Sequence, residues 1–140
     1  MLLLRICLVS IMLVTVFSIS SCIVTSHDYS VELSCEQFGE NDHYFSDFEL
    51  EIGDKIRLAL CSNQTTGFQW DYEITTDNIV KEEDHDFEEP EEGIIGAAGI
   101  ELWTFEAIEK GTTEIKMEYS QPWEGGLKVE WTYTARIIVK

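Results

Sequence analysis

The sequence predicts an all-β chain folded as a β-sandwich of seven to eight strands. After the first 28 residues almost every segment alternates apolar and polar residues with period two, which is typical of half-buried strands. No segment of comparable length repeats with the period of a helix, and polar turns separate the strands. The 140 residues are 44% hydrophobic and 11% aromatic, so the chain holds one folded domain at most and is too apolar for a disordered acidic tail.

The strands follow one another in six clear segments. Their alternating positions are, in chain order, Tyr29, Val31 and Leu33; Phe48, Leu50 and Ile52; Ile56, Leu58 and Leu60; Phe68, Trp70, Tyr72 and Ile74; Thr113, Ile115, Met117 and Tyr119; and Val129, Trp131, Tyr133, Ala135, Ile137 and Val139. Gly53-Asp54 marks a tight turn between the second and third segments. The first three segments are compatible with a meander in one sheet.

Two polar stretches are expected to be loops. Residues 39–46 carry no apolar alternation. Residues 81–92, KEEDHDFEEPEE, hold eight carboxylates in twelve positions and lack the Asp-x-Asp-x-Asp-Gly order of a calcium loop. With Pro90 opposing regular structure, this stretch is predicted to be a solvated, mobile acidic loop rather than a metal site.

The charge balance excludes several classes of function. Asp and Glu outnumber Lys and Arg 27 to 9, which gives a formal charge of -18 and leaves no basic stripe for nucleic acid. The three histidines, His27, His43 and His85, lie beside no nucleophile motif and form no metal-spaced set with cysteines. We therefore expect no catalytic residue, metal or cofactor, and a chain that acts as a monomer.

The first 21 residues read as a signal peptide. Arg5 precedes an apolar run over 6–19, which is the length of a signal-peptide core and short of a membrane-spanning helix. Ile19-Ser20-Ser21-Cys22 resembles a lipobox, in which Cys22 would become the lipidated first mature residue and the membrane anchor. The alternatives are an ordinary secretory signal or an uncleaved anchor. The protein is thus expected outside the cytoplasm, secreted or as a cell-envelope lipoprotein, with residues 22–46 as an N-terminal strand and linker.

Two cysteines remain after the leader. Cys35 and Cys61 are 26 residues apart, and an isolated even pair in an exported domain is compatible with one disulfide. If the first three segments form a meander, the two cysteines finish at the same end of the sheet on non-adjacent strands, which permits a bridge without establishing it. Two free buried thiols and a catalytic cysteine stay open as alternatives.

Three segments are not explained by strand alternation. They are NQTTGF at 63–68, the small-residue loop IIGAAG at 94–99 and QPWEGG at 121–126. In a sandwich these would connect strands B–C, D–E and F–G, and alternate connections emerge at the same end. Small residues allow a partner to approach the backbone, and an exposed Trp is a common interface anchor.

These residues resemble the chagasin-like inhibitors of papain-type cysteine proteases. That family carries Asn-Pro-Thr-Thr-Gly-Tyr/Phe-x-Trp, a Gly-x-Gly-Gly-type loop and Arg-Pro-Trp in this order, and here they read NQTTGFQW at 63–70, GAAG at 96–99 and QPW at 121–123. The similarity runs from Phe48 to Lys140. The domain at 47–140 is therefore identified as a chagasin-like inhibitor domain with an immunoglobulin-like sandwich fold.

The resemblance implies a reversible, tight-binding inhibitor that occludes the cleft of a papain-family cysteine protease with three loops. The first loop would lie across the catalytic centre, the second along the non-primed side and the third on the primed side, with Trp70 filling the core beneath the first. The implied protease-binding residues are Asn63, Gln64, Thr65, Thr66, Gly67, Phe68, Gly96, Ala97, Ala98, Gly99, Gln121, Pro122 and Trp123. Gln64 stands where the family has Pro, Gln121 where it has Arg, and GAAG lacks the second central Gly.

A second class of function remains possible from the sequence. An envelope-attached immunoglobulin-like module for adhesion or glycan binding would use Trp103, Trp123 and Trp131 as stacking faces. Trp131 alternates with strand neighbours, which favours its burial.

Overall fold

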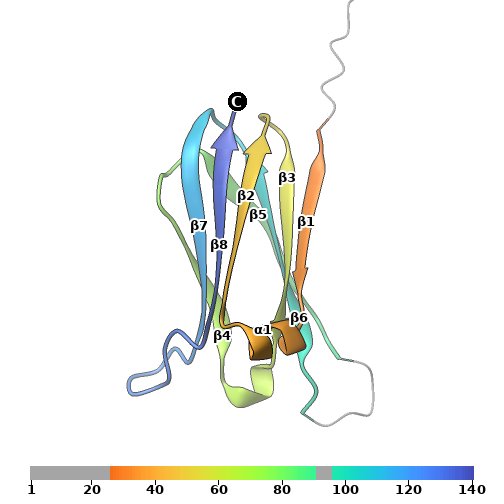
Figure 1. Cartoon of the computed structure of the whole chain (residues 1–140), viewed down its shortest axis with the longest axis vertical. Coiled ribbons are helices and arrows are strands. Elements are labelled where there is room, and N and C mark those ends of the chain that lie inside the picture. Colours follow the sequence, from red (N-terminus) through yellow and green to blue (C-terminus); the bar gives the residue numbers. More distant parts are fainter. Residues whose placement is uncertain (1–25, 91–95) are drawn as a thin grey trace, which may run out of the picture.

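The computed structural model describes residues 26–90 and 96–140, which form two four-stranded sheets packed face to face (Figure 1). The first sheet has the strand order β1-β3-β6-β5 and the second β2-β8-β7-β4. In chain order the elements are β1 (Asp28–Leu33), α1 (Cys35–Glu40), β2 (His43–Leu50), β3 (Lys55–Ser62), the 3-10 turn η1 (Gln64–Thr66), β4 (Gln69–Ile74), β5 (Val80–Glu88), β6 (Gly99–Ala107), β7 (Gly111–Ser120) and β8 (Trp131–Val139). The predicted all-β sandwich is confirmed.

The first three strands do not form a meander in one sheet. β1 pairs in parallel with β3 in the first sheet, whereas β2 pairs in parallel with β8 in the second. The helix α1 carries the chain from one sheet to the other, so part of the loop expected over 39–46 is helix and β2 already begins at His43. Ser34 caps this helix, because its hydroxyl accepts from the Gln37 amide while the Gln37 side chain accepts from the Ser34 amide.

The predicted acidic loop at 81–92 is also wrong over its first eight residues. They belong to β5, an edge strand that pairs antiparallel with β6 from Val80 opposite Ala107 to Glu88 opposite Ile100. Its charges are compatible with a strand because they line a sheet edge, where charge discourages pairing with other chains. Lys81 also forms a 2.8 Å ion pair with Glu106 on the neighbouring strand.

The core lies between the two sheets and is closed at one end by α1. Its largest fully buried side chains include Tyr133, Phe38, Phe105, Ile115, Met117 and Ile137. Phe38 comes from α1 and stacks on Trp131 with ring centroids 4.9 Å apart. The short helix is therefore held by packing against the end of the sandwich rather than by its own length.

The predicted Gly53-Asp54 turn is confirmed, and it lies at the end of the sandwich opposite α1. Gly53 has a φ of 96°, which favours glycine, and Asp54 is 2% exposed. Its carboxylate accepts from the amide of His27 at 2.7 Å and from that of Glu51 at 2.9 Å. One side chain thus fixes both the turn and the start of β1.

The predicted signal peptide at 1–21 and the lipid site Cys22 lie outside the described residues. Within 26–90 and 96–140, no helix combines the length and apolar character needed to cross a membrane.

Candidate functional site at the three-loop end

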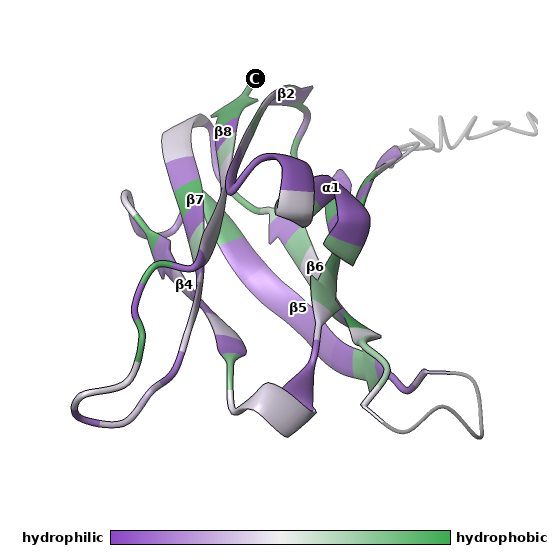
Figure 2. Ribbon diagram, turned by 60° about the horizontal axis from the view of Figure 1, so that its bottom comes forward, coloured by the Kyte–Doolittle hydropathy of each residue, from purple (hydrophilic) through white to green (hydrophobic). Residues whose placement is uncertain are grey.

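The structure brings the three loops together at one end of the sandwich. The connections β3–β4, β5–β6 and β7–β8 all leave the sheets at the end where α1 lies, opposite the C-terminus (Figure 1). Viewed towards this end, the β3–β4 loop with η1 lies between the other two (Figure 2). Of the second loop, Ile94 and Ile95 are outside the described residues.

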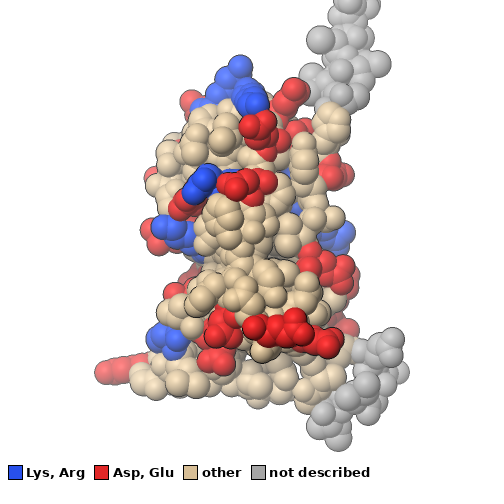
Figure 3. All heavy atoms as spheres, in the orientation of Figure 1, with Lys and Arg blue, Asp and Glu red and all other residues tan. Residues whose placement is uncertain are grey.

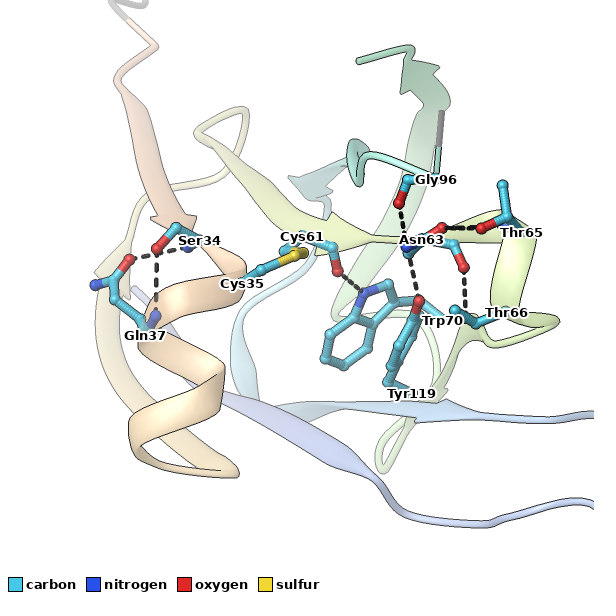
Figure 4. Close-up of a disulfide and its surroundings, with 10 residues drawn as sticks. All are labelled: Ser34, Cys35, Gln37, Cys61, Asn63, Thr65, Thr66, Trp70, Gly96 and Tyr119. Atoms are coloured by element: carbon cyan, nitrogen blue, oxygen red, sulfur yellow. Dashed lines mark hydrogen bonds between the residues drawn. A yellow bond between two sulfur atoms is a disulfide. The ribbon is translucent and has the colours of Figure 1, made fainter. Parts of the chain in front are cut away.

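The first loop is a compact turn held by its own polar groups (Figure 4). The Asn63 side-chain oxygen accepts from the amide of Thr65 at 3.2 Å and from its hydroxyl at 2.6 Å. The Thr66 hydroxyl donates to the Asn63 carbonyl at 2.6 Å, and Gly67 ends the turn with a φ of 77°. These bonds order the turn without the proline that Gln64 replaces, because an Asn side chain at a turn substitutes for backbone partners.

The first loop is anchored on the sandwich below it (Figure 4). The Asn63 amide donates to the Tyr119 hydroxyl at 2.7 Å. Trp70 is 3% exposed and its indole N–H donates to the Cys61 carbonyl at 2.9 Å, so its predicted place in the core is confirmed. Cys61 is joined in a disulfide to Cys35 of α1, with Cα atoms 5.1 Å apart, which ties the helix to the strand that leads into the loop.

The first loop also contacts both of its neighbours. The Asn63 side-chain amide donates to the Gly96 carbonyl of the second loop at 3.0 Å. The Gln121 side-chain amide, from the third loop, donates to the Thr66 carbonyl at 3.2 Å. The described parts of the three loops therefore form one connected surface rather than three independent segments.

Gln121 also closes the third loop on itself. Its backbone amide donates to the Leu127 carbonyl at 2.8 Å, and its side-chain oxygen accepts from the Leu127 amide at 3.0 Å. The Lys128 ammonium donates to the carbonyl of Gln121 and, at 3.4 Å, to that of Trp123. The side chain of Gln121, which stands in place of the family's Arg, thus forms hydrogen bonds with both the first loop and the third.

Trp123 lies against the first loop while half of it stays exposed. Its exposed fraction is 49%, and its indole covers Gly67 so closely that a Cβ there would lie 2.9 Å from the ring atom Cζ3. Glycine at 67 is therefore required both by the positive φ and by the approach of the indole.

The other sequence-predicted residues divide into exposed and supporting positions. Gln64, Thr65, Thr66, Gly96 and Pro122 are exposed, and Gly67, Ala97 and Ala98 are half-buried. Phe68 is half-buried and stacks on Tyr119 with centroids 5.2 Å apart, and Gly99 is buried at the start of β6 beneath Phe87. Phe68 and Gly99 support the loops from behind.

Sequence reasoning missed two features of this end. Tyr119 was assigned only to a strand, although it holds the first loop by a hydrogen bond. Val129 was expected to begin the last strand, but β8 begins at Trp131 and Val129 is exposed with a φ of 55°. The sequence does not indicate which group the Tyr119 hydroxyl will bond. Val129 fits the apolar alternation of 129–139, so the pattern gave no sign of its irregular backbone.

The charge at this end is mostly negative (Figure 3). Exposed acidic residues around the described loops are Glu36, Glu40, Asp42, Glu88, Glu89, Glu124 and Glu130. In the described third loop the basic residue is Lys128, and its ammonium is engaged by backbone carbonyls.

The groups at this end suit binding rather than catalysis. The first loop and the Gln121–Trp123 segment present backbone amides and carbonyls, the hydroxyls of Thr65 and Thr66, side-chain amides and one indole, with carboxylates around them. Within 26–90 and 96–140 no group of three His, Cys, Asp or Glu side chains is placed to hold a metal ion. Of the tryptophans considered for glycan stacking, Trp103 is buried and Trp131 is stacked between Phe38 and Tyr119, so Trp123 is the exposed one of the three.

Comparison with known proteins gives a consistent set of similarities. The model of the chagasin family peptidase inhibitor I42 matches residues 49–137. Amoebiasin-2 of Entamoeba histolytica is 29% identical over 102 residues, which cover 72% of this chain and 81% of that protein. Chagasin of Trypanosoma cruzi is 28% identical over 87 residues, which cover 59% of this chain and 79% of that protein.

Solved structures show the same architecture. The crystal structure of the cysteine protease inhibitor EhICP2 from Entamoeba histolytica superposes with a TM-score of 0.64 and 26% identity, covering 83% of this chain and 100% of that one. PbICP-C, solved in complex with falcipain-2, shares the fold with a TM-score of 0.53 and 12% identity, over 82% of this chain and 98% of that one.

Proposed function

This chain belongs to the chagasin family of peptidase inhibitors, and we propose that it is a reversible, tight-binding inhibitor that occludes the active-site cleft of papain-like cysteine proteases with its three loops. It is a cysteine protease inhibitor and not an enzyme. The observation that carries the three-loop mechanism is the set of contacts that joins the loops, from Asn63 to Gly96, from Gln121 to Thr66 and from Gly67 to Trp123.

The contacts between the loops explain how the inhibitor binds tightly without forming a covalent bond to the protease. A flexible peptide loses conformational freedom when it binds, and that loss weakens binding. Here the hydrogen bonds within the first loop and to its neighbours fix the surface before the protease arrives. The first loop therefore needs little further ordering when it binds the protease.

The same geometry explains why the inhibitor would escape cleavage. A cysteine protease must place a scissile carbonyl against its thiolate and oxyanion donors. In the first loop the carbonyl of Asn63 accepts from the Thr66 amide at 3.1 Å, that of Gln64 accepts from the Gly67 amide at 3.1 Å, and that of Thr66 accepts from Gln121. A 3-10 turn with engaged carbonyls fills the cleft but does not present an extended substrate.

Each loop has a proposed place in the cleft. Residues 65–67 lie over the catalytic Cys–His pair, residues 96–98 lie along the non-primed side, and Pro122 with Trp123 lie on the primed side. The order of the loops supports this assignment, because the first loop lies between the other two (Figure 2).

The test is a titration of papain and of a cathepsin L-type protease with the purified protein. We expect inhibition that is complete near one equivalent, is reversed by dilution into excess substrate, and leaves the inhibitor uncut. A small ligand bound at the active site should compete with the protein. Inhibition of neither enzyme, nor of other papain-type proteases, by a folded sample would contradict the proposal.

The leader supports a location outside the cytoplasm. We propose that residues 1–21 direct export and that Cys22 carries the lipid that anchors the protein. The protein acts as a monomer. The Cys35–Cys61 disulfide supports export, because structural disulfides persist in oxidising compartments. Mass spectrometry of the mature N-terminus tests it: a diacylated Cys22 is expected, and an unmodified N-terminus elsewhere would contradict lipidation.

A further inference from the structure

The third loop exposes more apolar surface than the Pro-Trp motif requires. Leu127 is 61% exposed and Val129 49% exposed, beside Trp123 at 49%. Among the described residues, seven large hydrophobic side chains are exposed, and these three of the seven lie within one ten-residue loop. The loop extends outward from the end of the sandwich (Figure 1), and of the three side chains Trp123 lies against Gly67 of the first loop.

Val129 adopts a backbone conformation that its side chain disfavours. Its φ is 55°, in the left-handed region, where a β-branched residue is strained. The one other described non-glycine residue with positive φ is Asn78, a residue type that tolerates this region. Because Val129 is exposed, burial in the core does not offset the strain.

Val129 lies in the irregular segment that leads into β8. The facing limbs of the loop are paired by the Gln121–Leu127 hydrogen bonds and by the Glu130 amide, which donates to the Tyr119 carbonyl at 3.0 Å. Because Tyr119 pairs with Trp131 in the last register pair of β7 and β8, residues 128–130 lie opposite Ser120 alone. This irregular segment before β8 carries the positive φ of Val129.

We propose that Leu127 and Val129 form a second apolar contact area of the inhibitor, which binds an apolar patch on the rim of the protease cleft and selects among papain-type proteases. The proposal rests on the three-loop inhibition proposed above. Backbone strain such as the positive φ of Val129 is often found at functional sites. The area is continuous with the proposed interface, because Leu127 is bonded to Gln121, which in turn contacts the first loop.

The decisive variant is Val129→Gly, because a contact role and a structural role predict opposite results. Glycine accepts the φ of 55° without strain, so the unfolding temperature should stay the same or rise. If Val129 contacts the protease, the inhibition constant should nevertheless rise about tenfold, as for loss of a moderate interface side chain. Leu127→Ser should also weaken inhibition about tenfold.

Two matched controls lie at the opposite end of the sandwich. Asn78→Gly makes the same backbone change at the other positive-φ position, and Ile108→Ser removes an apolar side chain that is 37% exposed. Both should leave inhibition unchanged. Measured against papain and a cathepsin L-type protease, the loop variants should also change the ratio of the two inhibition constants.

The outcomes separate this proposal from the function on which it rests. If Trp123→Ala weakens inhibition while Val129→Gly and Leu127→Ser inhibit like the unchanged protein, the second contact area is overturned and the three-loop mechanism stands. If those two variants alter only self-association in sedimentation, the area serves contact between copies and the proposal is likewise overturned. Failure of the unchanged protein to inhibit any papain-type protease overturns the function itself.

Discussion

The indole of Trp123 rests on the backbone of Gly67, so the third loop and the first loop share one surface although they are far apart in the chain. A side chain at 67 would overlap the ring, and the φ of 77° at Gly67 excludes most other residues as well. The two family motifs that contain these residues therefore depend on each other in the fold.

Gly67→Ala tests this dependence. The methyl group would displace Trp123 and strain the backbone, so we expect a loss of about 1–3 kcal/mol in the free energy of unfolding and weaker inhibition by about tenfold or more. Gly53→Ala is the matched control, because Gly53 has a φ of 96°, lies at the far end and has nothing within 4 Å of an added Cβ. It should lose stability through strain alone and keep full inhibition. Equal inhibition by both variants would contradict the shared surface.

Gln121→Glu tests the bond between the first and third loops. The carboxylate still accepts from the Leu127 amide, but it replaces the donor to the Thr66 carbonyl by an acceptor, so the two loops should separate. One hydrogen bond is worth about 0.5–1.5 kcal/mol, which corresponds to inhibition weakened about three- to tenfold. Gln69→Glu adds the same charge on β4, where it should have less effect. If the two variants weaken inhibition equally, charge rather than the lost bond is responsible.

Replacing Cys35 and Cys61 together by Ser tests the role of the disulfide. The bridge closes a loop of 26 residues, so its loss should lower the free energy of unfolding by about 3 kcal/mol in chemical denaturation. Below the unfolding transition, inhibition should fall only slightly, because the loop contacts of Asn63 and Gln121 do not involve the sulfurs. Abolished inhibition in a folded double variant would show that the bridge shapes the loops directly.

The Asp54 carboxylate predicts how stability depends on pH. Burial raises the pKa of Asp54, but the amides of Glu51 and His27 together with the His27 side chain outweigh it, so the pKa lies below its ordinary value of 3.8. The ionised form therefore stabilises the fold above that value, and the stabilisation is lost as the pH falls from there towards the folded-state pKa.

Asp54→Asn should remove this dependence. At about pH 7 the variant should be less stable by about 1–3 kcal/mol, because the amide accepts fewer of the hydrogen bonds, and the difference should shrink towards about pH 2. Denaturant unfolding at several pH values measures it. A difference that stays constant across the acid range would contradict the assignment.

The sequence predicted the strands correctly where apolar and polar residues alternate regularly. The prediction failed for β5, which has polar residues in the middle of the strand, and for α1, which is too short to show a period. β5 was mistaken for a loop because Glu82 and His85, in the middle of the strand, are polar where they face buried residues of β6. His85 lies 2.9 Å from Glu101, and Glu82 accepts a hydrogen bond from the Tyr72 hydroxyl at 2.6 Å. At the edge of the sandwich, where β5 lies, these polar contacts take the place of apolar packing between the sheets. α1 was missed because six residues are too few to show a helical period.

At the site, the sequence identified the loops but not how they contact each other. The three motifs and their order were readable, whereas the bond from Gln121 to Thr66 joins residues 55 positions apart. Such a contact follows from the pairing of β4 with β7, which brings the ends of the two loops together. Val129 has high β-propensity but lies just outside β8 with a φ of 55°, so its propensity indicated the wrong conformation.

The central claim is that the first loop fills the protease cleft, and the inhibition constant of Thr66→Trp tests it most directly. Thr66 is exposed at the middle of the three loops, so an indole there should collide with the catalytic centre and weaken inhibition of a papain-type protease about a hundredfold or more. Ile52→Trp places the same bulk at the opposite end, where Ile52 is 45% exposed, and should inhibit like the unchanged protein. Equal inhibition by the two variants, both shown to be folded, would contradict occlusion by the first loop.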